Sequence, residues 1–194
     1  MDFSTLKSRV LALIGRAPAD VVYELVTSDI NADLRMTIQE STTTITEAAS
    51  MSLPSDFLSV VDVYRDVDPR TPLRPTTAQA INRTHITSGT PSEYAIVDGA
   101  MLLNPSPNGS ETVNLRYIAK LTDLSADDDT NDVLTKYPQI YVYGVLYHHG
   151  ILIGDTRSGL WQAAYDGARR QAKQSDARDR FSGAPLTPST RVNP

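Results

Sequence analysis

The sequence predicts an α+β protein that is mainly α, in which a small antiparallel β module interrupts a helical bundle. Three observations predict this. Apolar residues recur with helical spacing towards both ends of the chain, β-branched residues alternate with polar ones in the middle, and the last residues combine three prolines with little apolar content. We expect a helical hairpin (1–36), the β module with its loops (37–122), two long C-terminal helices (123–181) and an extended C-terminal arm (182–194).

The N-terminal part of the chain predicts two helices. The spacing of its apolar residues indicates a first helix over about 3–16, ended by Gly15 and Pro18. A second apolar face from Val22 to Leu34 predicts another helix. Asp20 stands at the position of its N-cap, where a carboxylate can accept a hydrogen bond from the first turn. The two helices would form a short hairpin.

Between residues 37 and 122 the composition favours strands. We expect strands at 37–40, 42–47, 57–65, 94–97, 100–103 and 112–119. Asp98-Gly99 suits a tight turn that needs positive φ, so the strands before and after it should form a hairpin. Four of the twelve prolines fall within 66–92, which predicts loop with short irregular pieces. Together the strands predict one small antiparallel sheet.

An acidic loop at 123–129 precedes a long helix that we predict over 131–154, because acidic side chains favour the positive end of a helix. This helix is apolar nearly all round, so it must be covered nearly all round. Gly154 and Asp155 end it. A final helix over 156–179 would turn Leu160, Trp161, Ala164, Tyr165, Ala168 and Ala172 inward and Arg169, Arg170 and Lys173 outward.

Composition excludes several kinds of protein. None of the 194 residues is cysteine, which excludes disulfides, thiolate metal ligands and thiol nucleophiles. The start MDFSTLKSRV does not resemble a signal peptide, and no run of about eighteen apolar residues predicts a membrane span. Residues 1–155 carry 11 Lys and Arg against 20 Asp and Glu (−9), and residues 156–194 carry 7 against 3 (+4). The basic end indicates an acidic partner, with a solvated helix face and free tail as the alternative.

The motifs contain no recognisable catalytic or metal-binding set. His148 and His149 are neighbours on a helix and point about 100° apart, so they cannot chelate one ion together, and a packed or interfacial role is the default. Asp127-Asp128-Asp129 lacks the Gly and Glu positions of a calcium loop, so helix capping and solvation explain these acids better. Glycine-rich phosphate loops are also missing. We therefore expect no enzyme, no cofactor and no metal.

Tyrosines and basic residues predict contacts between subunits instead. Five of the nine tyrosines fall between 137 and 165, and a tyrosine combines an apolar ring with a hydroxyl that needs a partner, which suits an interface. The alternative is that they fill the core. The basic face of the last helix could meet the surplus acid of a neighbouring copy in a ring. The residues predicted at subunit contacts are Tyr137, Tyr141, Tyr143, Tyr147, Arg169, Arg170 and Lys173.

An ordered succession of motifs carries a family resemblance. The motifs are INADLRM, LPSDFLSVVDVYRD, TPSEYAIVDGAMLLNPSP, VNLRYIAKLTDLSADDDTNDVLTKYPQIYVYGVLYHHGILIGD and LWQAAYDGARRQAKQSDARDRFSGAPL. Each is weak alone, but their order over residues 3–186 resembles the head-to-tail connector, or adaptor, proteins of tailed bacteriophages. His148-His149 departs from the small or acidic residues that the family leads us to expect there.

The resemblance implies a structural protein of the virion neck, made in the host cytoplasm, with no turnover and no cofactor. Its copies would form a homo-oligomeric ring of about twelve that matches the symmetry of the portal protein. The ring would join the portal to tail or neck proteins, without a membrane, and DNA would pass through its channel without sequence-specific binding. The acidic surplus of residues 1–155 would line this channel. The C-terminal arm would dock on the portal through Phe181, Pro185, Leu186, Pro188 and Arg191.

Two other functions are compatible with the sequence. A tail-completion or tail-terminator protein also forms a ring, and it differs from an adaptor in its partner, which is the tail tube. A nucleic-acid-binding accessory protein would use the Arg-rich last helix, and it predicts DNA binding that weakens with salt.

Overall fold

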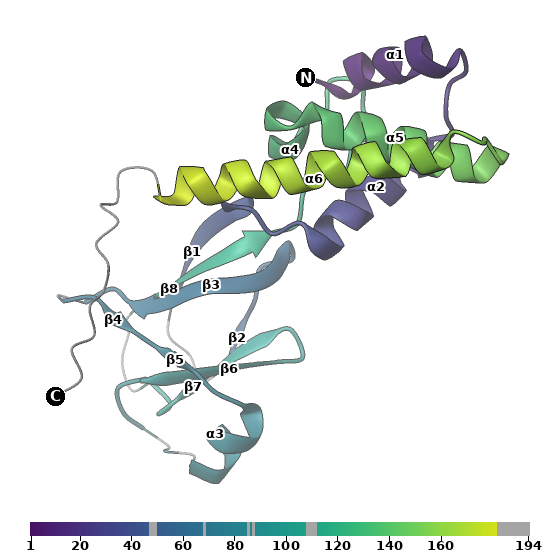
Figure 1. The fold of residues 1–194 in the computed structure, drawn as a ribbon. Helices are drawn as coiled ribbons and strands as arrows, with labels where there is room; N and C mark the ends of the chain where they lie inside the picture. Colours follow the sequence, from purple (N-terminus) through teal and green to yellow (C-terminus); the bar gives the residue numbers. More distant parts are fainter. Residues whose placement is uncertain (47–49, 68, 85, 87, 108–111, 182–194) are drawn as a thin grey trace, which may run out of the picture. The chain divides into compact units, whose positions relative to one another are not determined.

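Figure 1 shows the fold as a computed structural model, which describes residues 1–46, 50–67, 69–84, 86, 88–107 and 112–181. The chain divides into two compact units. The helical unit comprises Met1–Ile38 and the residues from Asp123 onward, and the β unit comprises Gln39–Thr122. The predicted class, α+β and mainly α, is confirmed.

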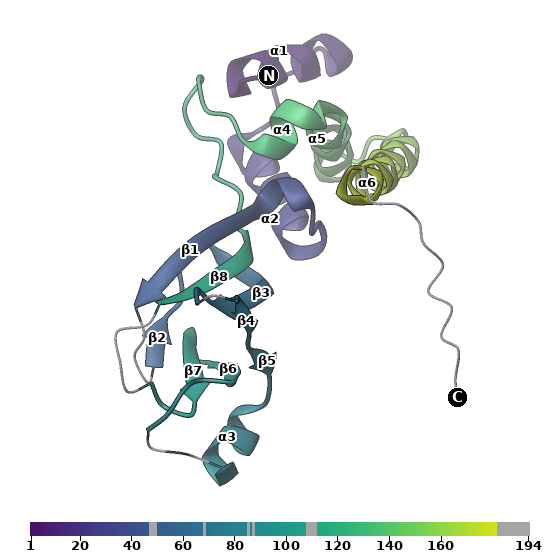
Figure 2. The same cartoon turned by 90° about the vertical axis from the view of Figure 1, so that its left-hand side faces the viewer.

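The helical unit is built from helices near both ends of the chain. They are α1 (Phe3–Ile14), α2 (Asp20–Asp33), α4 (Asp132–Lys136), α5 (Pro138–Ile153) and α6 (Ser158–Phe181). α5 and α6 run antiparallel and lie side by side, and α1 and α2 pack on α5 (Figure 1). The pairing of α5 with α6 is also visible in Figure 2. Segments from opposite ends of the sequence therefore share one core.

Local signals set the ends of α1 and α2. The Thr5 amide donates a hydrogen bond of 2.8 Å to Asp2, which caps α1, and Gly15 ends the helix with a φ of 70°. The helix predicted over 3–16 is therefore confirmed, with an end two residues earlier. The predicted N-cap Asp20 is wrong. Ala19 occupies that position, and Asp20 is the first helical residue, where its charge still favours the positive helix end.

The single long helix predicted over 131–154 is wrong, because the structure divides it into α4 and α5. Tyr137, between them, has a φ of −130° and a ψ of 58°, and Pro138 is the first residue of α5. Proline lacks the amide hydrogen that would continue α4, and its ring disfavours helical geometry in the preceding residue. The side chain of Asn131 caps α4 by accepting a hydrogen bond of 2.9 Å from the Leu134 amide.

The buried face of α6 is narrower than predicted. Tyr165 and Ala172 are buried, as expected, and Trp161 is half-buried. The Trp161 ring lies close against Gly150 of α5. Because the neighbouring helix position points about 100° away, Leu160 faces solvent. Leu160 is 71% exposed, so its predicted inward position is wrong.

The β unit contains two sheets rather than the one predicted. The first sheet has the strand order β1 (Glu40–Thr46), β8 (Thr112–Ala119), β3 (Phe57–Arg65) and β4 (Thr71–Pro72). The second sheet has the strand order β2 (Ser50–Ser52), β7 (Ala100–Asn104), β6 (Glu93–Val97) and β5 (Arg74–Pro75). Paired strands are antiparallel except β5 and β6, which are parallel. The predicted hairpin of β6 and β7 is confirmed, since Asp98 and Gly99 form its turn with φ values of 49° and 71°.

Two short elements between residues 37 and 92 differ from the predicted secondary structure. Thr37–Gln39, expected in a strand, forms the 3₁₀ turn η1. The Asp176 carboxylate of α6 binds the Thr37 amide at 2.9 Å, so this amide is not available to a sheet. Within the expected loop 66–92, Ala78–Thr84 forms the short helix α3.

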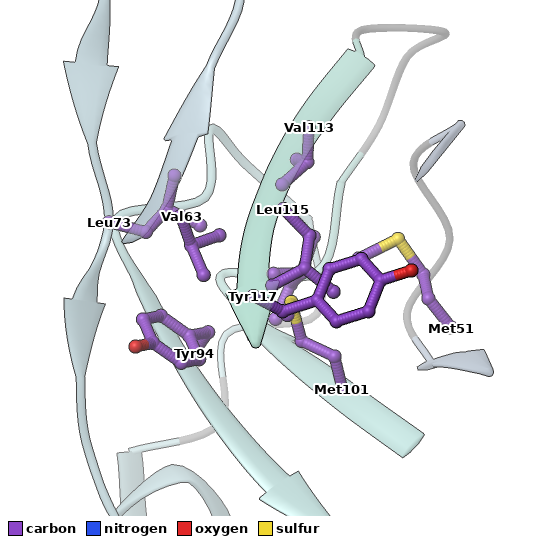
Figure 3. Packing of buried hydrophobic residues seen from close by; sticks show 9 residues of the cluster. Met51, Val63, Leu73, Tyr94, Met101, Val113, Leu115 and Tyr117 are labelled. Atoms are coloured by element: carbon purple, nitrogen blue, oxygen red, sulfur yellow. The ribbon is translucent and has the colours of Figure 1, made fainter. Parts of the chain in front are cut away.

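The two sheets share one apolar core. Its buried members are Met51, Val63, Leu73, Tyr94, Met101, Leu103, Val113, Leu115 and Tyr117. Figure 3 shows these side chains turned toward one another. Val113, Leu115 and Tyr117 are alternate residues of β8, so they share a face of the strand and bury it together.

Candidate assembly surface

Tyr141 lies in the core of the helical unit and is fully buried. Asn131 donates a hydrogen bond of 2.8 Å to its hydroxyl oxygen, and the Thr27 hydroxyl lies 3.3 Å from the same atom. Burial raises the pKa of Tyr141. These side chains connect α2, α5 and the start of α4, so Tyr141 stabilises the unit itself and offers no surface to a partner.

The other tyrosines predicted at subunit contacts keep part of their surface accessible. Tyr137, Tyr143 and Tyr147 are half-buried. The Tyr147 ring stacks on Tyr165 of α6, with ring centroids 6.3 Å apart. The Lys136 ammonium lies 5.4 Å from the centroid of the Tyr137 ring, a cation–π contact. A role of these three residues between subunits stays a prediction.

An open groove runs between α1 and the α4–α5 segment, and we call it the α1–α5 groove. It has a volume of about 710 Å³, and its lining includes Arg9, Leu13, Lys136, Pro138, Val142 and Tyr143. Leu13 is 57% exposed although it is aliphatic. The lining thus combines apolar side chains with two cations. Such a groove suits a partner that brings apolar side chains and negative charge together.

Two of the basic residues predicted at a subunit boundary are engaged within the chain. Arg169 and Lys173 of α6 both bind the carboxylate of Asp33 at the end of α2, with Lys173 at 3.2 Å. The Lys173 hydrogen bond is the main cause of a lowered pKa of Asp33, and the Arg169 charge adds to it. Arg170 and Arg178 are exposed and have no ion-pair partner among the described residues. These two cations remain available to a partner.

The turn between α5 and α6 exposes a cluster of aliphatic side chains. Ile151, Leu152 and Ile153 are 53%, 60% and 49% exposed, and Leu160 lies just beyond the turn. The expectation that this helix is covered nearly all round is therefore wrong for its last turn. Gly154 and Asp155 end α5 and reverse the chain, so these aliphatic side chains lie at the end of the helix, in its last turn. Clustered exposed aliphatic residues are typical of interaction surfaces.

The sequence prediction missed the role of Asp176, which is only 5% exposed. Its carboxylate accepts hydrogen bonds from the Thr37 amide, at 2.9 and 3.0 Å, and from the Thr37 hydroxyl, at 3.0 Å. The Arg180 guanidinium donates to the same hydroxyl at 3.0 Å. The partners are 139 residues apart, so no local pattern indicates the contact. The available signal is helical spacing, because Asp176 continues the buried stripe of Tyr165 and Ala172.

The histidines and the acidic loop have contacts that explain them structurally. His148 Nε2 lies 2.8 Å from Asp29 Oδ2 of α2, and His149 is buried. Asp129 accepts hydrogen bonds of 2.7 Å from two backbone amides of its own loop, which lowers its pKa, and Asp127 pairs with a lysine of α1.

Within the described residues, no group of three side chains is placed to hold a metal ion. The helices of the described segments are too short or too polar to cross a bilayer.

The predicted docking arm follows α6. Phe181 is the last residue of this helix. Pro185, Leu186, Pro188 and Arg191 lie outside the described residues. Their role in portal docking stays a prediction that comes from the family resemblance.

Comparison with known proteins identifies the family. No curated protein matches the chain. The family model described as SU10 adaptor protein matches residues 1–189, a range that includes the α1–α5 groove, all of α6 and the whole β unit. Because the match extends over nearly all 194 residues, the chain belongs to the SU10 adaptor protein family, and its resemblance to the head-to-tail adaptors of bacteriophages is confirmed.

Proposed function

We propose that the protein is a structural component of the virion neck, where its copies form a ring between the portal and the tail. The observation that carries this proposal is the SU10 adaptor match over residues 1–189. An adaptor must present one docking surface to every subunit of a cyclic portal, and a ring of the same symmetry does so with identical contacts. The expected ring contains about twelve copies.

The surfaces of the helical unit support association between copies. The helical unit exposes an aliphatic cluster at Ile151–Ile153 and the apolar lining of the α1–α5 groove. Both are larger than the single exposed apolar residues that are normal on a protein surface. Arg170 and Arg178 add uncompensated positive charge within the described part of the chain. Because these surfaces differ from one another, contacts between them are head-to-tail, and head-to-tail contacts of suitable rotation close into rings.

The charge distribution supports a passive channel for the genome. Residues 1–155 carry a net charge of −9, with 11 basic and 20 acidic residues. If this part of each copy faces the channel, its acids repel phosphate and keep the DNA mobile. DNA would then pass through the ring without sequence-specific binding.

Mass measurement of the complex with portal tests the proposed function. Full-length protein is mixed with the portal of the same phage, and native mass spectrometry counts the bound copies. We expect one adaptor copy for each portal subunit. Deletion of residues 182–194 should abolish the complex while the circular dichroism of the helices is unchanged, and the same residues in shuffled order serve as the control for arm length. A complex that survives the deletion would contradict the docking arm.

The alternatives give different outcomes in the same set of measurements. Binding to tail tube without binding to portal would identify a tail-completion or terminator ring. DNA binding that falls steeply with salt, and that replacement of Arg170 and Arg178 by alanine removes, would identify a nucleic-acid accessory protein. Arg169 is less informative for this purpose, because Asp33 already neutralises it.

A further inference from the structure

The α1–α5 groove and the outer face of α2 are complementary. We propose that the groove of each copy receives the outer face of α2 from the neighbouring copy. The inference rests on the proposed ring and assigns the two surfaces that meet in it. The occupant of the groove is thus a second copy of this chain, bound through a helix face that differs from the groove itself.

The α1–α5 groove is complementary to a partner surface that carries apolar side chains with negative charge beside them. Leu13, Val142 and Tyr143 supply its apolar lining. Arg9 is exposed and has no ion-pair partner in the described ranges of the chain. Lys136 binds a carboxylate of α6 at 2.8 Å, but an ammonium group has three donors, and this side chain is still 42% exposed. A partner with carboxylates beside its apolar side chains would pair with both cations.

The outer face of α2 has this composition. Val21 and Leu25 lie one helical turn apart and are 49% and 41% exposed, whereas the inward face of the same helix holds its buried residues. Asp20 and Glu24 precede each of them by one position, and both are exposed. Neither acid has an ion-pair partner within the described segments. An apolar pair and an acidic pair therefore run in parallel along the face.

The dimensions and charges of the two surfaces agree. Side chains four positions apart on a helix lie about 5–6 Å from each other, so Val21 and Leu25 can enter one groove together. The groove volume of about 710 Å³ leaves room for both side chains, as in other complexes in which an apolar helix face enters a groove. The two acids would then lie near Arg9 and Lys136. This contact joins different surfaces of two identical chains, so it propagates from copy to copy.

The other exposed apolar cluster fits the groove less well. The turn at Ile151–Ile153 carries one acid, Asp155, and Arg157 binds this carboxylate at 2.8 Å in the same copy. The Arg157 hydrogen bonds lower the pKa of Asp155 to about 2. Since this charge is already neutralised, the turn offers nothing to Arg9. The unpaired acids of α2 make it the better occupant.

Cysteine cross-linking between copies tests the contact directly. The chain has no cysteine, so every introduced thiol is unique. Leu25→Cys protein and Val142→Cys protein are mixed in equal amounts, assembled with portal and oxidised with diamide. We expect disulfide-linked dimers in the mixture and none from either protein alone, and a ladder of multimers from the double variant. Dimers from Leu25→Cys alone would indicate a symmetric contact and would overturn the inference, as would a mixture without dimers.

Charge reversal provides a second test that does not depend on thiol geometry. Arg9→Glu and Glu24→Arg should each weaken association between copies by about tenfold, because each replaces an attraction by a repulsion. The combined variant should recover most of the loss, while Arg16→Glu, outside both surfaces, serves as the charge control. Absence of recovery, with the helical circular dichroism of all variants intact, counts against the pairing.

The measurements separate this inference from the proposed function. Portal complexes of normal mass in which Leu25→Cys and Val142→Cys fail to cross-link would retain the adaptor function and refute the α2 contact. Cross-links between copies that form no complex with portal would retain the contact and refute the adaptor function. If Arg9→Glu abolishes portal binding but leaves association between copies unchanged, the groove receives the portal instead, and the inference fails.

Discussion

The helical unit and the β unit are held together by different kinds of contact. In the helical unit, buried polar side chains connect segments that are far apart in sequence: Tyr141 with Thr27, and Asp176 with Thr37. In the β unit, strand ladders enclose an apolar core, and the hydroxyl of Tyr117 reaches out of this core to Asp56 at 3.0 Å. Apolar helix faces pack in several similar ways, whereas a buried polar group is stable only in the arrangement that pairs it. The β unit also buries polar side chains such as Asn104 and Asn114, but they lie in strands whose pairing the ladders already set. The comparison teaches that polar contacts specify packing most where no ladder does, which is between the helices.

The two units also differ in the surface they leave open. The helical unit exposes aliphatic residues on α1, α2 and the α5–α6 turn, while Ile86 and Ile96 are the large aliphatic residues with such exposure in the described part of the β unit. Grooves and clustered apolar residues are typical of assembly surfaces. The helical unit is therefore where we place the contacts between copies.

The largest expected effect comes from removing the Asp176 carboxylate. Asp176→Ala leaves the Thr37 amide and hydroxyl without their acceptor in a buried site, so we expect a loss of about 3 kcal/mol in the free energy of unfolding. Hydrogen exchange resolved by residue should show faster exchange in α6 and around residue 37. Asp179→Ala is the matched control, because its exposed pair with Lys136 contributes below about 1 kcal/mol. Equal losses in both variants would contradict a special role of the buried acid.

Asp176 also marks the limit of prediction from the sequence. β8, β3 and the hairpin turn at Asp98-Gly99 follow from alternation and local turn chemistry, so they were predictable. The division into two sheets was not, because it depends on pairings between distant strands. The turn at Thr37–Gln39 depends on a carboxylate 139 residues away, and a local pattern has no access to that contact.

Gly144 of α5 and Gly167 of α6 differ in the space around them, so alanine at each position tests how closely the helices pack. A Cβ atom at Gly144 would lie 2.9 Å from Val26 of α2 and 3.0 Å from Tyr165 of α6, so Gly144→Ala should lower stability by about 2 kcal/mol. Gly167 of α6 has open space at the same position, and Gly167→Ala should raise stability by about 0.5–1 kcal/mol through its higher helix propensity. Thermal unfolding of both variants gives the sign. A stabilising Gly144→Ala would show that α2, α5 and α6 are less tightly packed.

The sequence predicts the composition of the candidate assembly surface, but it does not predict which of its side chains are exposed. Clustered tyrosines and the basic last helix predict subunit contacts in the helical unit, yet Tyr141 is fully buried and Arg169 binds Asp33. Periodicity predicts which face of a helix is apolar, but it does not predict which neighbouring helix covers that face. Leu160 was expected on a packed face and is exposed for this reason.

The hydroxyls of Tyr141 and Tyr117 allow a direct comparison of how much a polar contact stabilises each unit. Tyr141→Phe removes the buried hydroxyl that accepts the hydrogen bond of Asn131 and lies beside Thr27, so we expect a loss of about 1–2 kcal/mol. Tyr117→Phe releases the partly exposed Asp56 to water, and the loss should stay below about 1 kcal/mol. Chemical denaturation of both variants measures the difference. A larger loss in Tyr117→Phe would reverse the conclusion that buried polar contacts matter most in the helical unit.

The smallest effect concerns the exposed pairs of Asp33 with Arg169 and Lys173. The pKa of Asp33 is lowered from 3.8, so its stabilisation is present above that value and is lost as the pH falls through the lower pKa of the folded state. Asp33→Asn should therefore lower stability at neutral pH by a few tenths of a kcal/mol, and the difference should vanish in acid and at about 1 M salt. Asp128→Asn, whose carboxylate has no partner among the described residues, is the control. If Asp33→Asn changes nothing at low salt, the pairs of Asp33 with Arg169 and Lys173 do not contribute to the stability of the helical unit.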